Sequence, residues 1–393
     1  MLNVECSVLN DGTAGLHSTL NIQHSAFNIS LSSLSTPAFL VDHTIVEQNC
    51  ARMRAKALAS GVAFRPHVKT HKTIEIARMQ HGGATGPITV STMAEAEFFA
   101  DGGFGDITYA VPIAPEKLAR AAALAARIER LNILIDSEIA LRAVEEFHAA
   151  NGVVFDVFLK VDCGYHRAGL DPNDPDSARL ALAMAQSPAV HFQGLLTHAG
   201  HSYNAHDVEE IRRIAAEEIE SLTRFRALLG IDNLTRSIGS TPTTAVADTF
   251  ADTDEIRPGN YVFFDAFQST LGSCTRDEVA VSVLATVVGS YPERGQAIID
   301  AGALALSKDV SPEHLDPNFG FGLVCDVGLR PLPARLVALS QEHGKLTMST
   351  PLPVGTRVRV IPNHSCLTAA MYDCYHVIDG DQIIDEWRPA RGW

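Results

Sequence analysis

The residues with the clearest chemical potential form one short run, Arg65-Pro66-His67-Val68-Lys69-Thr70-His71-Lys72, directly after the apolar segment 62–64. A lysine held among other cations, here Arg65, Lys72 and His71, loses its proton more easily than a lysine in water, because like charges disfavour the ammonium form. A neutral amine can attack an aldehyde and form a Schiff base. Taken alone, the run fits a basic surface loop equally well.

A second candidate group lies near the end of the sequence, in Pro362-Asn363-His364-Ser365-Cys366. In an extended segment residues i and i+2 project to the same side, so His364 and Cys366 can bind one metal ion together. Imidazole and thiolate favour zinc over magnesium or calcium, and two protein ligands leave positions for water and substrate. An isolated His-x-Cys pair is more often structural. Cys374 and His376 form a rival pair, which ranks lower because segment 372–378 has the composition of a buried strand.

A turn rich in small and hydroxyl residues, Gly239-Ser240-Thr241-Pro242-Thr243-Thr244, suits a phosphate. Backbone amides and hydroxyls donate hydrogen bonds to phosphate oxygens, and a following helix start adds a favourable dipole. Gly259 and Asn260 could close the cup from a neighbouring loop. The alternative is a Ser/Thr-rich helix cap.

Three further side chains could contact a planar, anionic cofactor. His198 could stack on its ring, and Arg167 could hold a phenolate or a carboxylate, because the guanidinium presents a fixed fork of donors. Tyr203 is a weaker candidate, as is His201. A histidine bonded to the backbone and an ordinary salt bridge are the structural alternatives for His198 and Arg167.

The elements that must position these groups alternate between strand and helix from residue 36 to about residue 268. A first strand, 36–42, precedes a helix that ends at Gly61. Further strands are expected at 62–64, 88–91, 107–111, 132–136, 155–161, 192–197, 236–239 and 255–264, with helices such as 114–127, 137–151, 177–186 and 208–229. About eight alternations predict a parallel (β/α)8 barrel of the TIM type over 36–268, whose functional groups follow the strands. No G-x-G-x-x-G follows the first strand, which disfavours a doubly wound sheet.

After residue 268 the pattern changes to short strand-like runs separated by glycine, proline and aspartate. These runs are 281–288, 296–300, 335–339, 345–347, 357–361, 374–378 and 382–384. They predict a mostly antiparallel β domain over 269–393 that carries the metal site. Residues 1–35 could return to pair with this domain.

Composition limits the class of protein. The net charge is −15 and no basic tract occurs, so nucleic acid is not expected as a partner. No apolar run is long enough to span a membrane, and residues 1–35 resemble neither a secretory signal nor a transit peptide. Seven scattered cysteines, an odd number, indicate a reducing cytoplasm rather than a disulfide framework.

The lysine run together with the late His-x-Cys motif resembles the D-serine dehydratase and D-threonine aldolase group of pyridoxal-phosphate enzymes, over residues 36–393. The resemblance implies the alanine-racemase fold (fold type III), a homodimer, a Schiff-base lysine at Lys69 and a metal site at His364 and Cys366. It also implies that Arg167 lies near the cofactor phenolate and that His198 stacks on the ring. The implied phosphate cup comprises Gly239, Ser240, Thr241, Gly259, Asn260 and Tyr261.

Within this group the aldolase branch shows H-x-D at the metal site, whereas the dehydratase branch shows H-x-C. Cys366 therefore favours a lyase that converts D-serine to pyruvate and ammonia, with Lys69 as general base and zinc, or else manganese or cobalt, on the leaving hydroxyl. Arg257 could lie near the pyridine nitrogen of the cofactor. A D-threonine aldolase, a D-threo-3-hydroxyaspartate dehydratase and an amino-acid racemase remain open, as does a cofactor-carrying binding protein without turnover.

Overall fold

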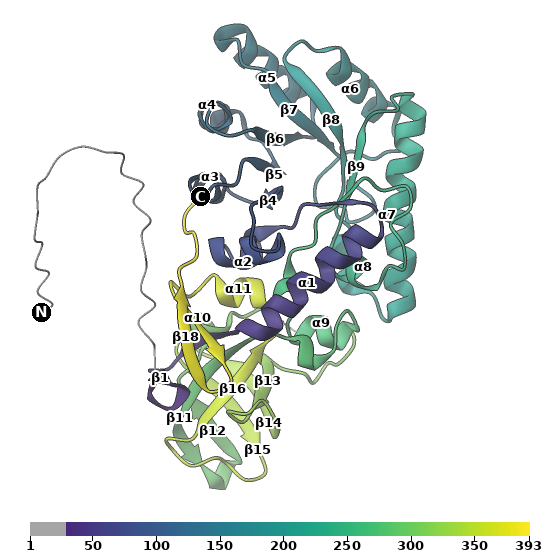
Figure 1. The fold of residues 1–393 in the computed structure, drawn as a ribbon. Helices are drawn as coiled ribbons and strands as arrows, with labels where there is room; N and C mark the ends of the chain where they lie inside the picture. The colour runs from purple at the N-terminus through teal and green to yellow at the C-terminus, as the bar shows by residue number, and fades with distance from the viewer. Residues whose placement is uncertain (1–28, 311) are drawn as a thin grey trace, which may run out of the picture.

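The computed structural model describes residues 29–310 and 312–393, which build two sheets (Figure 1). The first sheet is parallel, with the strand order β3-β10-β9-β8-β7-β6-β5-β4. Its two outer strands meet through a parallel bridge between His67 and Thr89, where the Thr89 N–H donates to the Pro66 carbonyl at 2.9 Å. The predicted TIM-type barrel is therefore confirmed. Its strands are β3 (Ala63–Phe64), β4 (Ile88–Val90), β5 (Asp106–Pro112), β6 (Arg130–Ile135), β7 (Phe155–Lys160), β8 (Val190–Leu196), β9 (Thr235–Ile238) and β10 (Glu255–Ile256).

Helices cover the outside of this barrel, and most begin at a residue that caps them. The capping side chains accept a hydrogen bond from the first turn and so satisfy an N–H that lacks a partner within the helix. They are Asp42, Thr92, Ser137, Asp174, Asp207 and Ser240. The helices are α1 (His43–Ala59), α2 (Ile74–Gln80), α3 (Met93–Asp101), α4 (Leu118–Ala125), α5 (Glu138–Asn151), α6 (Pro175–Gln186), α7 (Val208–Leu229) and α8 (Thr241–Val246).

The second sheet has ten strands in the order β1-β18-β17-β2-β11-β12-β15-β14-β13-β16. An additional pairing of β11 with β16 closes its larger part into an antiparallel barrel. The strands are β1 (Ile29–Ser30), β2 (Ala38–Asp42), β11 (Val281–Tyr291), β12 (Gln296–Ile299), β13 (Gly322–Cys325), β14 (Pro331–Leu339), β15 (Gly344–Met348), β16 (Arg357–Pro362), β17 (Tyr375–Asp379) and β18 (Gln382–Trp387). Short helices α9 (Ala266–Leu271), α10 (Ala303–Leu306) and α11 (Ser365–Ala369) connect the parts.

The first predicted strand does not belong to the parallel barrel. It is β2, which lies between β11 and β17 in the second sheet. Phe39, Leu40 and Val41 are fully buried there, because a strand inside this sheet is covered on both faces. The sequence around β2 could not predict this pairing, because β11 and β17 lie more than two hundred residues further along the chain.

The last predicted barrel strand, 255–264, is too long. It ends at Ile256 because Pro258 cannot donate a ladder hydrogen bond and the chain then turns through the short 3-10 helix η5 (Asn260–Val262). At the other end of the chain, β1 pairs with β18, while residues 1–28 lie outside the described residues. The division at residue 268 stays a prediction.

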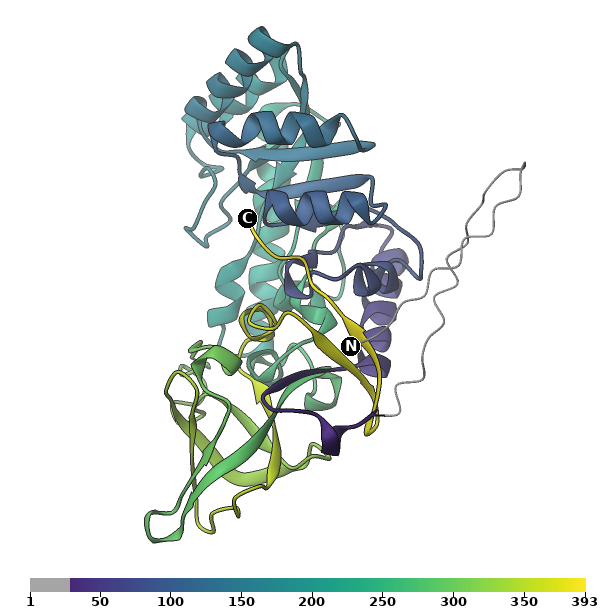
Figure 2. The same ribbon diagram turned by 90° about the vertical axis from the view of Figure 1, so that its left-hand side faces the viewer.

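Two segments connected to the second sheet reach the carboxyl ends of the barrel strands. One is α11, which follows β16. The other is the C-terminal segment after β18, which runs toward the barrel (Figure 2), where the Ala390 N–H donates to the Lys72 carbonyl at 2.7 Å. None of the described helices is long and apolar enough to cross a membrane.

Candidate active site

A cavity of about 480 Å³ lies where the carboxyl ends of the barrel strands meet α11. Functional groups of a barrel are expected at this end. Most of the residues that the sequence singled out as candidate site residues line it. They are Lys69, Arg167, His198, Tyr203, Gly239, Ser240, Thr241, Gly259, Asn260, His364 and Cys366.

Lys69 lies in a single 3-10 turn, η2 (Val68–Thr70), that follows β3. Its backbone N–H donates to Nδ1 of His67 at 3.4 Å, which fixes the start of the turn. Burial lowers the pKa of the Lys69 amine below that of an ordinary lysine, and the nearby Arg167 and Arg257 lower it further, while Cys366 opposes them. A larger fraction of the Lys69 side chain is therefore the neutral amine than for a lysine in solvent.

The cations that depress this pKa are not the ones expected from the sequence. Arg65 is paired with Glu255 at 2.5 Å and with Asp106 at 2.6 Å, and Lys72 is paired with Glu95 at 2.9 Å. Those carboxylates neutralise their charges. The effective cations come instead from loops after later barrel strands, which the local run around Lys69 cannot reveal.

His364 and Cys366 face the same cavity as Lys69, some three hundred residues away in sequence. Although burial raises the pKa of the Cys366 thiol, His364 and Lys69 lower it to about 7. Burial lowers the pKa of His364, but Cys366 and the carboxylate of Asp309 together raise it well above its usual value. The sulfur lies 3.2 Å from Oγ1 of Thr70. A thiolate beside an imidazole is a donor set that suits zinc.

The turn between β9 and α8 forms a narrow cup at one end of the cavity. Gly239 has a φ of +140°, and a Cβ added there would lie 2.9 Å from the backbone nitrogen of Arg257. A Cβ at Gly259 would lie 3.0 Å from the carbonyl oxygen of His67. Only glycine permits this close approach of the loops. Glu218, buried beneath the cup, accepts hydrogen bonds from the N–H groups of Gly239 and Ala199 at 3.1 and 3.0 Å.

His198 and Tyr165 form one wall of the cavity, with their ring centroids 5.9 Å apart. Nδ1 of His198 lies 2.7 Å from the Gly239 carbonyl, so this nitrogen carries the proton and donates. Burial and the charge of Lys69 hold the pKa of His198 well below its usual value, which keeps the ring neutral. The guanidinium carbon of Arg167 lies 5.0 Å from the centroid of the Tyr165 ring. His201 stands behind Tyr165 and does not line the cavity.

Asn260 lines the cavity with its side chain, whereas Tyr261 reaches the cup through its backbone. The Asn260 amide donates to Asp265 and to Ser365, each at 2.8 Å, and so ties the barrel loop to α11. Tyr261 does not line the cavity. Its ring packs against Phe64 on the opposite side, and only its backbone N–H reaches the cup, where it donates to Thr241 at 3.2 Å.

Several residues at the cavity were not singled out from the sequence. Lys160 lies at the carboxyl end of β7, so the barrel rule itself could have found it. Burial, with the charge of Arg257, lowers the pKa of its amine to about 8. His67 lines the cavity beside Lys69, with Nε2 3.3 Å from the Ser91 hydroxyl. Asp309, whose Oδ2 lies 2.5 Å from Nδ1 of His364, comes from an irregular loop and left no sequence signal.

Among the described residues, four basic side chains and no carboxylate line the cavity. Lys69, Lys160, Arg167 and Arg257 all line it, whereas no aspartate or glutamate is among the described residues that do so. Arg257 donates to the Ser237 hydroxyl at 2.7 Å and also to the Thr197 carbonyl. In a chain with a net charge of −15, this concentration of cations predicts an anionic ligand.

Comparison with known proteins decides the family. Residues 41–266 match the family described as "Alanine racemase, N-terminal domain", and residues 280–378 match "Putative serine dehydratase domain". The D-serine dehydratase of Dictyostelium discoideum is 39% identical over 399 residues, which cover 93% of this chain and 99% of that protein. The chain belongs to the D-serine dehydratase and D-threonine aldolase group.

Solved structures of this group have the same architecture. The D-threo-3-hydroxyaspartate dehydratase of Delftia sp. HT23 superposes with a TM-score of 0.87 at 36% identity, covering 93% of this chain and 100% of that one. It has also been solved as a His-to-Ala variant and, in a metal-free form, as a Cys-to-Ala variant two positions further along. The D-threonine aldolase of Filomicrobium marinum has a TM-score of 0.79 at 27% identity, over 93% of this chain and 98% of that one.

Membership in this group of pyridoxal-phosphate enzymes makes the chain an enzyme of the lyase class. The expected resemblance and the expected fold are both confirmed. The rival pair Cys374 and His376 lies on β17 and beside it, and neither residue lines the cavity.

Proposed function

We propose that this enzyme removes water from a D-β-hydroxy amino acid with the help of pyridoxal phosphate and zinc, converting D-serine to pyruvate and ammonia. The observation that carries the proposal is that Lys69 and the pair His364 and Cys366 line one cavity. An amine and a metal-binding pair that face one cavity allow removal of a proton and departure of a hydroxyl from adjacent carbon atoms of one ligand.

The shape and charge of the cavity fit the cofactor. The cup formed by Gly239, Ser240 and Gly259 has no room for a Cβ at either glycine. Its backbone amides and the Ser240 hydroxyl suit a phosphate. Lys69 would hold the aldehyde, and Arg167 and His198 would hold the ring. Pyridoxal phosphate, when bound, supplies an electron sink that stabilises negative charge next to the substrate nitrogen.

The protein residues then have separate tasks. Once the substrate amine has replaced it at the aldehyde, the free Lys69 amine, whose pKa is lowered, would take the α-proton of the substrate as general base. Lys160 and Arg167 would attract the substrate carboxylate, since no acidic side chain among the described residues lines the cavity to compete with it. The cavity walls, made partly of Tyr165 and Leu196, would limit the access of bulk water.

His364 and Cys366 would hold a metal ion, which when bound acts as a Lewis acid on the leaving hydroxyl. The lowered pKa of the Cys366 thiol provides a ready thiolate, and Asp309 orients the His364 ring from behind. The spacing matches the two substituted positions in the Delftia dehydratase, whose Cys-to-Ala variant has been solved in a metal-free form. Zinc fits this donor set, and manganese or cobalt would be the next candidates.

Two neighbouring activities are the alternatives, because proteins with those names are relatives. A D-threo-3-hydroxyaspartate dehydratase is 37% identical over 381 residues and would use the same groups on a substrate with a second carboxylate. A D-threonine aldolase would break a carbon–carbon bond instead of eliminating water. A racemase would not need His364 or Cys366.

The deciding experiment is a substrate panel of D-serine, D-threonine and D-threo-3-hydroxyaspartate with product identification. We expect pyruvate and ammonia from D-serine, loss of this activity after chelation and its return with zinc. Oxaloacetate formed faster from the hydroxyaspartate would favour the first alternative, and glycine with acetaldehyde from D-threonine would favour the second. A chelator-resistant change of configuration at the α-carbon would contradict the elimination altogether.

We also propose that the enzyme works as a homodimer in the cytoplasm. Leu367 on α11 and Met371 just after it are 45% and 42% exposed beside the metal pair, and a second copy could cover them. The six cysteines of the described residues form no disulfide, which suits a reducing compartment. Sedimentation analysis of the wild type against a Leu367→Glu variant tests the dimer.

A further inference from the structure

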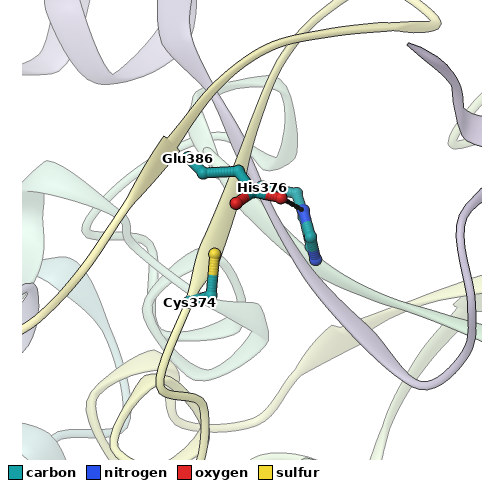
Figure 3. A group of neighbouring side chains, drawn as sticks. All are labelled: Cys374, His376 and Glu386. Carbon is teal, nitrogen blue, oxygen red and sulfur yellow. Dashed lines mark ion pairs between the residues drawn. The ribbon is translucent and has the colours of Figure 1, made fainter. Parts of the chain in front are cut away.

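A second cluster of metal-ligating side chains lies outside the active-site cavity, on the C-terminal strand pair. It comprises Cys374, His376 and Glu386, which we call the hairpin triad (Figure 3). One ligand atom from each side chain lies within 4.8 Å of the other two. None of the three lines the cavity that contains Lys69.

The backbone holds these side chains on one side of the sheet. His376 on β17 and Glu386 on β18 are directly paired across the two antiparallel strands. Cys374 lies just before β17, and its sulfur is within 4.8 Å of ligand atoms of His376 and Glu386. The alternating residues Tyr375, Val377 and Trp387 are buried in the core instead. Strand register therefore fixes His376 and Glu386, and Cys374 joins them from the residue next to the strand.

The contact between His376 and Glu386 has the separation expected of two ligands of one ion. Nδ1 of His376 lies 3.3 Å from Oε1 of Glu386, yet this buried nitrogen makes no hydrogen bond among the described residues. The ring is thus not aimed straight at the carboxylate. In a tetrahedral zinc site with bonds of about 2.0–2.2 Å, a nitrogen and an oxygen ligand lie about 3.3–3.6 Å apart and both point to a shared centre between them.

The chemistry of the triad selects the ion. A thiol, an imidazole and a carboxylate are together the ligand types of zinc, and hard ions such as calcium would have only the carboxylate oxygens. Burial lowers the pKa of His376, so its ring is neutral and able to bind a metal. Burial and Glu386 raise the pKa of Cys374 to about 11, and a cation at this point would offset the negative charge that keeps the thiol protonated.

We propose that the hairpin triad binds a second zinc ion, separate from the metal held by His364 and Cys366. Cys374, His376 and Glu386 supply three ligands, and water supplies the fourth. The thiol proton is released to solvent as the ion binds.

This ion would stabilise the segment that joins the two halves of the active site. The triad lies just after α11, which carries Cys366, and just before the tail that contacts Lys72 through Ala390. A metal bridge between β17 and β18 would therefore hold both connections in place. Its effect would appear in stability rather than in the chemical step, since no triad residue lines the cavity.

The test uses the variant H364A/C366A, which keeps the triad and lacks the proposed active-site ligands. After incubation with zinc and removal of free metal, we expect one zinc ion per chain in this variant, two in the wild type, and none after adding C374S and H376A. The unfolding temperature of H364A/C366A should fall on chelation. With cobalt in place of zinc, the variant should show the strong visible bands of a tetrahedral thiolate site, and the single change Cys374→Ser should abolish them.

A control pair, C274S/H343A, changes the same residue types away from the triad and should leave the metal content unaltered. Absence of bound zinc in H364A/C366A would overturn the proposal. So would equal zinc content with and without C374S and H376A. The cobalt spectrum of H364A/C366A needs no change in the triad, so poor folding of the triad variants would not obscure the answer.

Discussion

Nδ1 of His364 lies 2.5 Å from Oδ2 of Asp309. The carboxylate fixes the orientation of the ring and leaves Nε2 as the nitrogen available to a metal ion. Because Asp309 belongs to the loop after α10 and His364 follows β16, two separate parts of the second sheet domain together determine the geometry of one ligand.

Replacing Asp309 with asparagine should lower the affinity for zinc by about 10- to 100-fold, since a neutral amide is a weaker acceptor for the imidazole N–H. Competition with a chelator of known affinity measures this change. Dehydratase activity should fall in dilute zinc and return when zinc is in excess. Asp316→Asn, in the same exposed region, should behave as the wild type. Equal zinc affinity in the two variants would show that the carboxylate does not support the ligand.

Replacing Cys366 with aspartate should shift the metal preference from zinc toward manganese or magnesium, because a carboxylate oxygen is a harder ligand than a thiolate. Activity of the metal-depleted variant, measured with each ion in turn, tests this expectation. Cys366→Ser should lose activity with all of them. Unchanged preference in the aspartate variant would indicate that the sulfur does not bind the ion.

Replacing Lys69 with alanine should abolish the visible absorption of the bound cofactor and lower turnover by about 10²- to 10⁴-fold or more, since the general base is lost. Spectra and initial rates measure both effects in one preparation. Lys345→Ala, on β15 of the other domain, is the control and should retain both. A variant without Lys69 that still forms pyruvate at the wild-type rate would rule out this residue as the base.

Lys160 should make stability depend on pH in the cofactor-free protein. Its pKa falls from 10.5 to about 8 on folding, so between these values the unfolded chain binds more protons and stability rises with pH. Below pH 8 the full cost of burying the charge is present, about 3 kcal/mol at about 1.4 kcal/mol for each pH unit. Lys160→Met should therefore be more stable than the wild type at pH 7, and the difference should vanish toward pH 10.5.

Unfolding temperatures of the two proteins at pH 7, 8.5 and 10 test this prediction. The comparison cancels the titration of other groups that both proteins share. A difference that stays constant with pH would mean that the Lys160 amine has the same pKa in the folded and the unfolded chain. Addition of phosphate, an anion that the cavity should accept, is expected to reduce the difference at pH 7 by pairing with the wild-type amine.

The sequence was informative where one local pattern carried the chemistry. The eight barrel strands followed from alternating strands and helices, and Lys69, His364 and Cys366 followed from two short motifs. The rule that functional groups follow barrel strands also brought Arg167 and His198 into the set. All five residues line the cavity.

Relations between distant segments could not be predicted in this way. Asp309 contacts His364 across 55 positions, and only the folded chain brings the irregular loop to the ligand. The resemblance implied Tyr261 at the phosphate cup without saying which of its atoms would face it: its backbone N–H donates to Thr241 there, while its ring packs against Phe64. The strand β2 was wrongly predicted to belong to the barrel, because no nearby residue indicates that it pairs with β11 and β17.

The position of β2 links the two sheets through the order of the chain. The described part of the chain begins in the second sheet, forms the whole parallel barrel and then completes the second sheet. A fragment ended near residue 268 would leave Phe39, Leu40 and Val41 bare, and the remaining piece would have a gap between β11 and β17. We therefore expect neither half to be active when expressed alone, because Lys69 lies in one fragment and His364 and Cys366 lie in the other.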